Sequence, residues 1–436
     1  MDSIEIATLS IVALLGLIGL KVPIGVALIV VSFVGIWLST SMGAAWGLTR
    51  AVPFNFVAKW EFSAVPMFLL MGYIASNAGL TTAMFTAMRL LLNRLPGGLA
   101  CATVGASSMF AAASGSSIAT SAAMARIAIP EMSRAKYDLS LSTGSVASAG
   151  TLGSMIPPSI AMVIYGVFTD TSIGKLFIAG VIPGLLSALM FVVMIVIRVR
   201  LKPSLAPREQ VARVWSPELK AALKEIWPLP TLILCVLGGI FAGLMTPTEA
   251  GAVGAFVAIL ITLYRGVFSI ALMRGALRDA AIGTSTIFLI AIGASMFTAY
   301  MGLSGLPATV SQGLLDTVES PITLILIIAA VCLIGGMFLD SIGLMLLTLP
   351  FFIPVLQGAD IDFIWFGIIM VKLLEIGLIT PPVGLNCYVI QSAMGKSVPL
   401  STVFRGAGWF VATDLVTLSL LISFPILALW LPGLMG

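Results

Sequence analysis

Two short segments place glycine, serine and aspartate in the middle of long apolar stretches. The first reads FAAASGSSIAT at residues 110–120, and the second reads GGMFLDSIG at residues 335–343. Hydroxyl, carbonyl and carboxylate oxygens suit a hard cation, whereas the N–H groups at a helix start attract an anion. Small residues also allow helices to pack closely, so either segment alone fits both a binding tip and a packing contact.

Two further segments interrupt helices with paired prolines. Residues 149–159 read AGTLGSMIPPS, and residues 375–384 read EIGLITPPVG. Proline removes a backbone donor and clashes with the preceding turn. The freed carbonyls cost several kcal/mol in hydrocarbon unless protein or a ligand satisfies them. A structural kink explains one such helix, but two matching broken helices indicate the central site of a transporter, where Na⁺ fits the oxygen ligands.

Other site chemistries lack the residues they need. The sequence contains no histidine, which removes the commonest metal ligand and proton shuttle. No Ser–His–Asp or Cys–His set, nucleotide-binding loop or carboxylate pair can be assembled from the sequence. We therefore expect neither an enzyme nor a bound cofactor. The four cysteines form no CxxC pair and are expected in the core: Cys101, Cys235, Cys332 and Cys387.

A few charges lie within apolar segments, where they are costly. Lys372 and Glu375 are three residues apart and can share a helix face, which favours a neutralising pair over a substrate contact. We expect structural roles for Asp414 and for Glu249.

Composition indicates an integral membrane protein. Of the 436 residues, 59% are hydrophobic and 9% are charged, whereas soluble proteins contain about 25% charged residues. At roughly 20 residues per helical span, the apolar stretches supply about ten crossings. The sequence therefore predicts an all-α polytopic membrane protein.

The chain contains an internal repeat at an offset of 224 residues. Pro157-Pro158 matches Pro381-Pro382, and Ser117-Ile118 matches Ser341-Ile342. We expect a first repeat at 1–200, a basic cytoplasmic linker at 201–226 and a second repeat at 227–436. Each repeat is predicted to contain a re-entrant hairpin with arms of about 14 residues (98–131 and 321–357) and a broken helix (137–168 and 361–393). Further predicted elements are amphipathic arms at 43–60 and 266–280 and spans that include 281–303 and 405–433.

Charge predicts the topology. Five crossings per repeat would invert the second repeat relative to the first. With both termini outside, every basic residue except Arg50, Lys59, Lys175 and Lys372 falls on the cytoplasmic side, as the positive-inside rule requires. Arg50 and Lys59 are expected to snorkel at the outer interface, with contact to a partner or substrate as the alternative.

Several of these segments resemble one family over essentially the whole chain. The segments are PGGLACATVGASSMFAAASGSS (96–117), ARIAIPEM (125–132), GTLGSMIPPS (150–159), TPTEAGAVGA (246–255) and GLITPPVGLN (377–386). They resemble the large, DctM-like membrane subunit of the tripartite ATP-independent periplasmic (TRAP) transporters. The resemblance implies sodium-driven uptake across a bacterial inner membrane by an elevator mechanism, in which a transport domain slides against a scaffold.

The resemblance also implies sites and partners. A periplasmic substrate-binding protein would deliver an organic acid, and a small membrane subunit is expected as a separate chain because this chain starts at the first large-subunit helix. Besides these partners and membrane lipids, no nucleic acid is expected. The first sodium site would use Ser114, Ser116, Ser117, Gly150 and Gly153, and the second Gly336, Asp340, Ser341, Gly377 and Thr380. The substrate would lie near Ser117, Thr151, Pro158 and Thr380.

Two alternatives remain at the level of sequence. A self-sufficient sodium/divalent-anion symporter of the same broad architecture would transport without either partner. A membrane scaffold without transport activity would show no sodium-dependent uptake even with every partner present.

Overall fold

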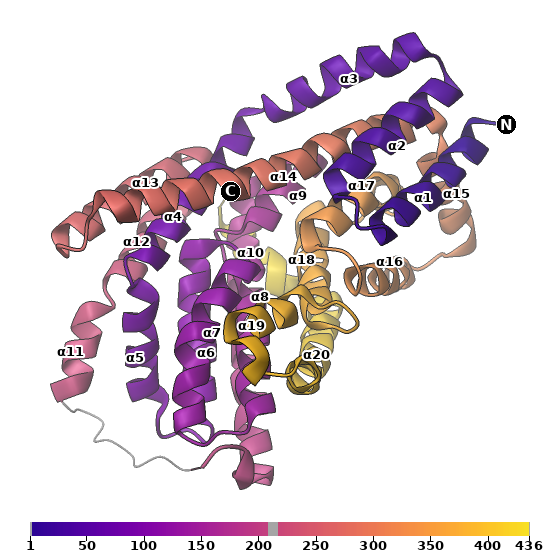
Figure 1. Ribbon diagram of the computed structural model, residues 1–436. Helices are drawn as coiled ribbons and strands as arrows, with labels where there is room; N and C mark the ends of the chain where they lie inside the picture. Colours follow the sequence, from indigo (N-terminus) through magenta and orange to yellow (C-terminus); the bar gives the residue numbers. More distant parts are fainter. Residues whose placement is uncertain (1, 208–216, 436) are drawn as a thin grey trace.

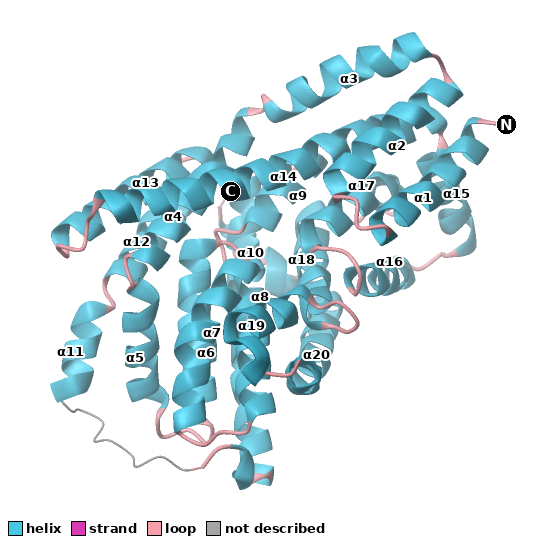
Figure 2. Cartoon of the chain, viewed as in Figure 1, coloured by secondary structure: helices cyan, strands magenta, loops and turns pink. Residues whose placement is uncertain are grey.

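The computed structural model describes residues 2–207 and 217–435, and within these residues all regular structure is helical (Figure 2). This confirms the predicted all-α class. Arg208 and Arg213 of the predicted linker lie outside the described residues. The helices of the first half are α1 (Ser3–Gly19), α2 (Ile24–Ser39), α3 (Met42–Val57), α4 (Ala64–Asn77), α5 (Leu80–Leu92), α6 (Gly98–Ser114), α7 (Ser117–Arg134), α8 (Leu139–Met155), α9 (Ile160–Thr169) and α10 (Ile173–Leu201).

The second half repeats this order after α11 (Pro217–Glu225), which lies within the predicted linker. Its helices are α12 (Pro228–Phe241), α13 (Pro247–Tyr264), α14 (Ile270–Ser304), α15 (Leu306–Thr317), α16 (Pro321–Gly336), α17 (Ser341–Gly358), α18 (Phe363–Ile379), α19 (Leu385–Met394), α20 (Leu400–Ser423) and α21 (Ile426–Leu429). Adding 224 to the bounds of α7 and α8 gives the bounds of α17 and α18.

Side-chain caps explain why corresponding helices begin at corresponding positions. Ser116 caps α7 and Asp340 caps α17, each accepting a hydrogen bond from a backbone N–H three residues on. Asp138 and Asp362 cap α8 and α18 in the same way. Such a cap satisfies a helix-start donor that otherwise has no partner, so the short polar residues determine the helix starts in both halves.

The helix α14 corrects one prediction. The arm expected at 266–280 and the span expected at 281–303 form one helix of 35 residues. In the first half, Pro53 lies inside α3, and a 3₁₀ turn at Trp60–Ser63 follows α3 before α4. The second half has no proline at the corresponding place, and single glycines such as Gly275 do not end a helix. At 1.5 Å per residue, α14 is about 52 Å long.

Other boundaries also differ from the predictions. The span expected at 405–433 ends as α20 at Ser423, just before Pro425. The hairpin arms contain 16 to 18 residues, because the helices continue closer to the tips than the predicted length of about 14. The short helices α5 and α15 were not predicted, since their moderate polarity hides them among the apolar segments.

Six described helices are long and apolar enough to cross a membrane, or up to eight spans if two bent pairs each count as one. Four shorter apolar helices, including the hairpin arms α6 and α16, lie outside this number. Length and composition of the described helices therefore do not fix the number of crossings, and the ten expected from apolar content stay a prediction.

The helices form two groups (Figure 1). In the first, α14 lies along α2 and α4, and α13 packs on α4. In the second, α8 is almost wholly buried among α6, α7, α18 and α20, while α16 packs on α18. Each broken helix is thus covered by its own hairpin, and the two broken helices meet.

Close approach of α8 and α20 depends on glycine. A Cβ atom at Gly144 would overlap the backbone of Gly406. Backbones this close leave no space for any side chain, so this crossing requires glycine on both helices.

We predict that Gly144→Ala destabilises the protein by about 1–3 kcal/mol, because overpacking forces the helices apart. The matched control is Gly408→Ala on α20, where an added Cβ meets no atom within 4 Å. Thermal unfolding in detergent would measure both variants. Equal melting temperatures for the two variants would contradict the prediction.

Candidate functional site

Both hairpin tips open onto one cavity. Its volume is about 450 Å³, and its lining includes Ser116 and Ser117 from the first tip and Asp340 and Ser341 from the second. Ser154, next to the first helix break, also lines it. The cavity therefore joins residues 224 positions apart in the repeat, as the pairing of the tips predicts.

The first tip is anchored on the first broken helix. The Ser117 hydroxyl lies 2.6 Å from the Ser154 hydroxyl and 3.2 Å from the Thr151 carbonyl oxygen, to which it donates. The backbone N–H of Ile160 donates to the Gly115 carbonyl at 3.3 Å. A serine hydroxyl and the end of an interrupted helix thus hold the hairpin in place.

Glycines make this contact possible. A Cβ at Gly153 would lie 2.7 Å from the Ser116 carbonyl oxygen, and one at Gly115 would lie 2.7 Å from the carbonyl oxygen of Pro158. Gly150 lies against Ser121. Of the predicted residues of the first sodium site, Ser116, Ser117 and Gly153 are therefore neighbours. The Ser114 hydroxyl pairs instead with Thr120 at 2.8 Å.

The second tip meets the second broken helix in the same manner. Gly336 and Gly377 touch through their backbones, since a Cβ at Gly377 would lie 2.8 Å from the Gly336 Cα. The backbone N–H of Val383 donates to the Met337 carbonyl at 3.1 Å. Both Pro–Pro bonds in the two breaks are cis.

The two polar side chains of the second tip, Asp340 and Ser341, differ in their hydrogen bonding. Asp340 Oδ2 accepts the backbone N–H of Gly343 at 3.0 Å. The Ser341 hydroxyl is buried and has no hydrogen-bond partner among the described residues. Thr380 lies at the end of α18, where its hydroxyl donates to the Ile376 carbonyl at 2.6 Å. Thr151, Pro158 and Thr380 do not line the cavity.

The opposite wall of the cavity comes from α4 and α14, through residues that include Tyr73, Thr286 and Ile290. A second cavity of about 190 Å³ shares Leu69 and Tyr73 with the first and contains Ser114, Arg126 and Asp279. Sequence reasoning missed this wall, because nothing in α4 or α14 marks the residues that face the tips.

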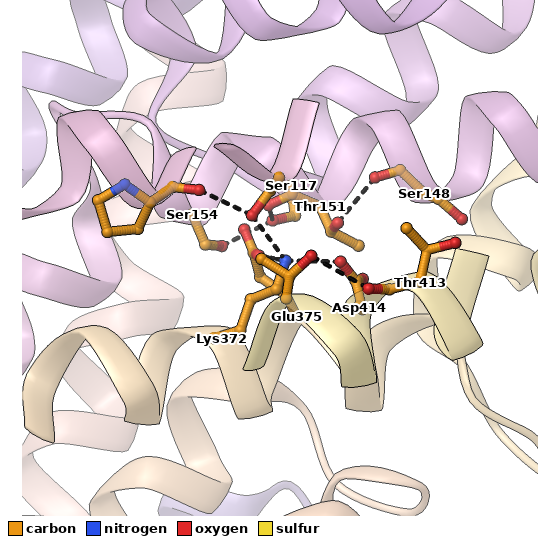
Figure 3. Close-up of polar contacts among 11 residues, drawn as sticks. Ser117, Ser148, Thr151, Ser154, Lys372, Glu375, Thr413 and Asp414 are labelled. Atoms are coloured by element: carbon orange, nitrogen blue, oxygen red, sulfur yellow. Dashed lines mark hydrogen bonds and ion pairs between the residues drawn. The ribbon is translucent and has the colours of Figure 1, made fainter. Parts of the chain in front are cut away.

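A buried charge cluster lies where the two broken helices pack together (Figure 3). The Lys372 ammonium is 3.3 Å from Glu375 Oε2 and 2.6 Å from Asp414 Oδ1, and all three side chains are fully buried. It also donates to the Ser187 hydroxyl at 3.0 Å. The predicted Lys372–Glu375 pair is confirmed. Asp414 adds a second carboxylate to this pair. The only sign of this role in the sequence was an acidic residue inside an apolar helix.

The cluster has one cation for two carboxylates. Glu375 Oε1 and Asp414 Oδ2 have no hydrogen-bond partner among the described residues. Buried charge is tolerated only when paired, so Lys372 is the group on which both carboxylates depend. Glu249, by contrast, caps α13 through Thr246 and has the expected structural role.

Comparison with known protein families shows which family the chain belongs to. The family model described as "Tripartite ATP-independent periplasmic transporter, DctM component" matches residues 11–427. The chain belongs to this family. The resemblance read from the hairpin tips and broken helices is thus confirmed.

Curated TRAP relatives match most of the chain. The C4-dicarboxylate TRAP transporter large permease protein DctM of Pseudomonas aeruginosa is 38% identical over 86% of each chain. The sialic acid large permease protein SiaM of Vibrio cholerae is 31% identical over 98% of each. The isethionate permease protein DctMQ of Oleidesulfovibrio alaskensis is 33% identical over 80% of this chain and 56% of its own. These relatives are transporter permeases, which confirms that the chain is no enzyme.

Two solved structures share the fold at low sequence identity. The YdaH transporter of Alcanivorax borkumensis gives a TM-score of 0.62 at 14% identity, covering 87% of this chain and 89% of its own. MtrF of Neisseria gonorrhoeae gives 0.63 at 15% identity, covering 97% and 95%. The TRAP subunit thus has the overall fold of other membrane transporters.

We predict that Lys372→Met destabilises the protein by about 3–5 kcal/mol, because two buried carboxylates lose their only cation. The control is Lys59→Met, which removes an exposed 3.4 Å pair with Asp170 and should cost about 1 kcal/mol or less. The triple variant Lys372→Met, Glu375→Gln, Asp414→Asn should recover stability, since no unpaired charge remains. Thermal unfolding of the three variants measures this, and similar values for the two lysine variants would refute it.

Proposed function

We propose that this chain is the permease subunit of a sodium-coupled TRAP transporter that imports an organic acid. The cavity between the two hairpin tips carries the proposal. Oxygen atoms from both tips line it, and one helix from each repeat, α7 and α17, begins at it. Family membership supplies the reaction class. The geometry supports the place where ion and substrate would bind.

The substrate class follows from the relatives. Their names refer to C4-dicarboxylates, sialic acid and isethionate, all of which are organic acids. An acid group needs N–H donors or positive charge. The N-termini of α7 and α17 supply the first at the cavity, and Arg126 in the adjoining cavity supplies the second.

Sodium coupling fits the ligands at both tips. Ser117, Ser154 and the Thr151 carbonyl place three oxygens together at the first tip. At the second, the buried Ser341 hydroxyl has no partner among the described residues, and Asp340 supplies a carboxylate nearby in sequence. A hard cation would satisfy these oxygens, and Na⁺ bound at unwound helices is a common coupling ion.

An elevator movement fits the two groups of helices. The tips and broken helices would move together as the transport unit, while α2, α3, α4, α13 and α14 remain as the scaffold. The cavity lies between these groups, since the tips line one wall and α4 and α14 line the other. A substrate held there would change its access when one group slides along the other.

The proposed setting is a bacterial inner membrane, with both termini in the periplasm. A small membrane subunit, as a separate chain, and a periplasmic substrate-binding protein would complete the tripartite system. The family description, tripartite and periplasmic, supports this arrangement. The same match does not favour the self-sufficient sodium/divalent-anion symporter.

The first prediction of this proposal concerns the whole system. Proteoliposomes containing this chain and its small subunit should accumulate an organic acid only with an inward sodium gradient and the loaded binding protein. Uptake is measured with radiolabelled acids. Equal uptake by this chain alone would support the self-sufficient symporter instead.

The second prediction concerns the tips. Asp340→Ala should raise the sodium concentration for half-maximal uptake about tenfold or more, because a contact to a charged group contributes about 1.5–3 kcal/mol. Ser117→Ala should act in the same direction but less. The controls Asp316→Ala and Ser285→Ala change exposed residues of α15 and α14. Unchanged sodium dependence in both tip variants would exclude the proposed ion sites.

A further inference from the structure

A groove with no assigned role lies between α10 and α20. Its volume is about 780 Å³, and α10 contributes Met190, Val193, Met194 and Ile197 to its apolar wall, with Val416 from α20 opposite them. The groove shares no residue with the cavity between the hairpin tips. It therefore needs its own explanation.

Three basic residues gather at one end of the groove. Arg198 and Lys202 come from the end of α10, and Arg405 comes from the first turns of α20. Among the described residues, none of the three side chains makes an ion pair or a side-chain hydrogen bond. The Arg198 guanidinium lies 4.6 Å from the ring centre of Trp409, and its Nη1 atom is buried without a partner among the described residues.

The groove contains one acidic residue, Asp138, which is already engaged. Its carboxylate accepts a hydrogen bond from the Ser140 hydroxyl and caps α8 by accepting the backbone N–H groups of Ser140 at 2.9 Å and Leu141 at 3.2 Å. Burial raises the pKa of Asp138, but the Ser140 hydroxyl, the two backbone hydrogen bonds and the charge of Arg405 bring the pKa below its ordinary value. Three cations against one engaged carboxylate leave the groove with a net positive charge.

An exposed apolar stripe on α10 runs toward the basic end of the groove. Leu185, Leu189, Val193 and Ile197 recur every four residues along α10 and are 43–58% exposed. Residues at this spacing line one helix face, and the stripe is about 18 Å long at 1.5 Å per residue. Trp409, also half exposed, belongs to a residue type enriched at the membrane interface.

We propose that this groove binds one anionic phospholipid, with its phosphate at Arg198, Lys202 and Arg405 and an acyl chain along the α10 stripe. Basic pockets between membrane helices are suited to such headgroups. The basic end lies on the side that charge distribution predicts to be cytoplasmic. A free phosphate ion would use the cations but would gain nothing from the apolar wall.

Binding here would act on the packing of the core. The helices α10 and α20 that form the groove also carry Ser187 and Asp414 of the buried charge cluster. A lipid that bridges α10 and α20 would hold together the two helices that enclose Lys372. It would therefore raise the melting temperature of the subunit independently of substrate and sodium.

The test compares full-length protein titrated with cardiolipin and with phosphatidylcholine in detergent. We expect native mass spectrometry to show one tightly retained cardiolipin and thermal unfolding to show stabilisation by cardiolipin alone. The variant Arg198→Gln, Lys202→Gln, Arg405→Gln should bind cardiolipin on the order of a hundredfold more weakly, because each basic residue near an anionic lipid contributes about fivefold. Ile197→Trp places a larger side chain in the groove and should also weaken cardiolipin binding, because less space remains for the acyl chain.

The control Lys220→Gln, Lys224→Gln, Arg278→Gln removes the same charge from exposed residues outside the groove and should bind like wild type. Equal loss of cardiolipin in both triple variants would show a diffuse charge effect and overturn the proposal. Retention of cardiolipin by the groove variant would do the same. Equal stabilisation by inorganic phosphate would assign the groove to the free ion and not to a lipid.

Discussion

The single ammonium of Lys372, buried between Glu375 and Asp414, is the interaction on which the core packing depends. It lies where α18, α20 and α10 meet, and α8 of the other repeat packs on α18 and α20. In a dehydrated interior, neither carboxylate can remain charged without it. The charge cluster therefore ties α18 to α20 and α10, and close glycine packing holds α20 against α8.

The candidate site follows from a second constraint, that backbone groups in hydrocarbon need partners. Each helix break frees polar groups, and each hairpin tip supplies some of the missing contacts, through Ser117 in one repeat and the Met337 carbonyl in the other. Ser154 beside the first break and the tip residues Ser116, Ser117, Asp340 and Ser341 then line the cavity. A membrane protein with few charges can build a polar site in this way from hydroxyls and interrupted backbone.

Sequence patterns predicted the local features of this fold better than the distant ones. Paired prolines and small-residue tips act within a few positions, so the two helix breaks and the two hairpin tips could be located. The role of Asp414 depends on a partner 42 residues earlier in the chain, and the cavity wall from α4 and α14 depends on tertiary packing. The continuity of α14 escaped detection because polarity changes along it without any helix breaker.

That continuity makes the two repeats unequal. The predicted inverted repeats would reverse access if each adopted the conformation of the other. Here α3 and α4 are separated by a 3₁₀ turn, whereas their counterpart α14 is one uninterrupted helix. Exchanging the two shapes would require breaking a turn of α14 that no proline assists. The first repeat alone therefore has a bend at this place, so the two halves contribute outer helices of different shape to the proposed scaffold.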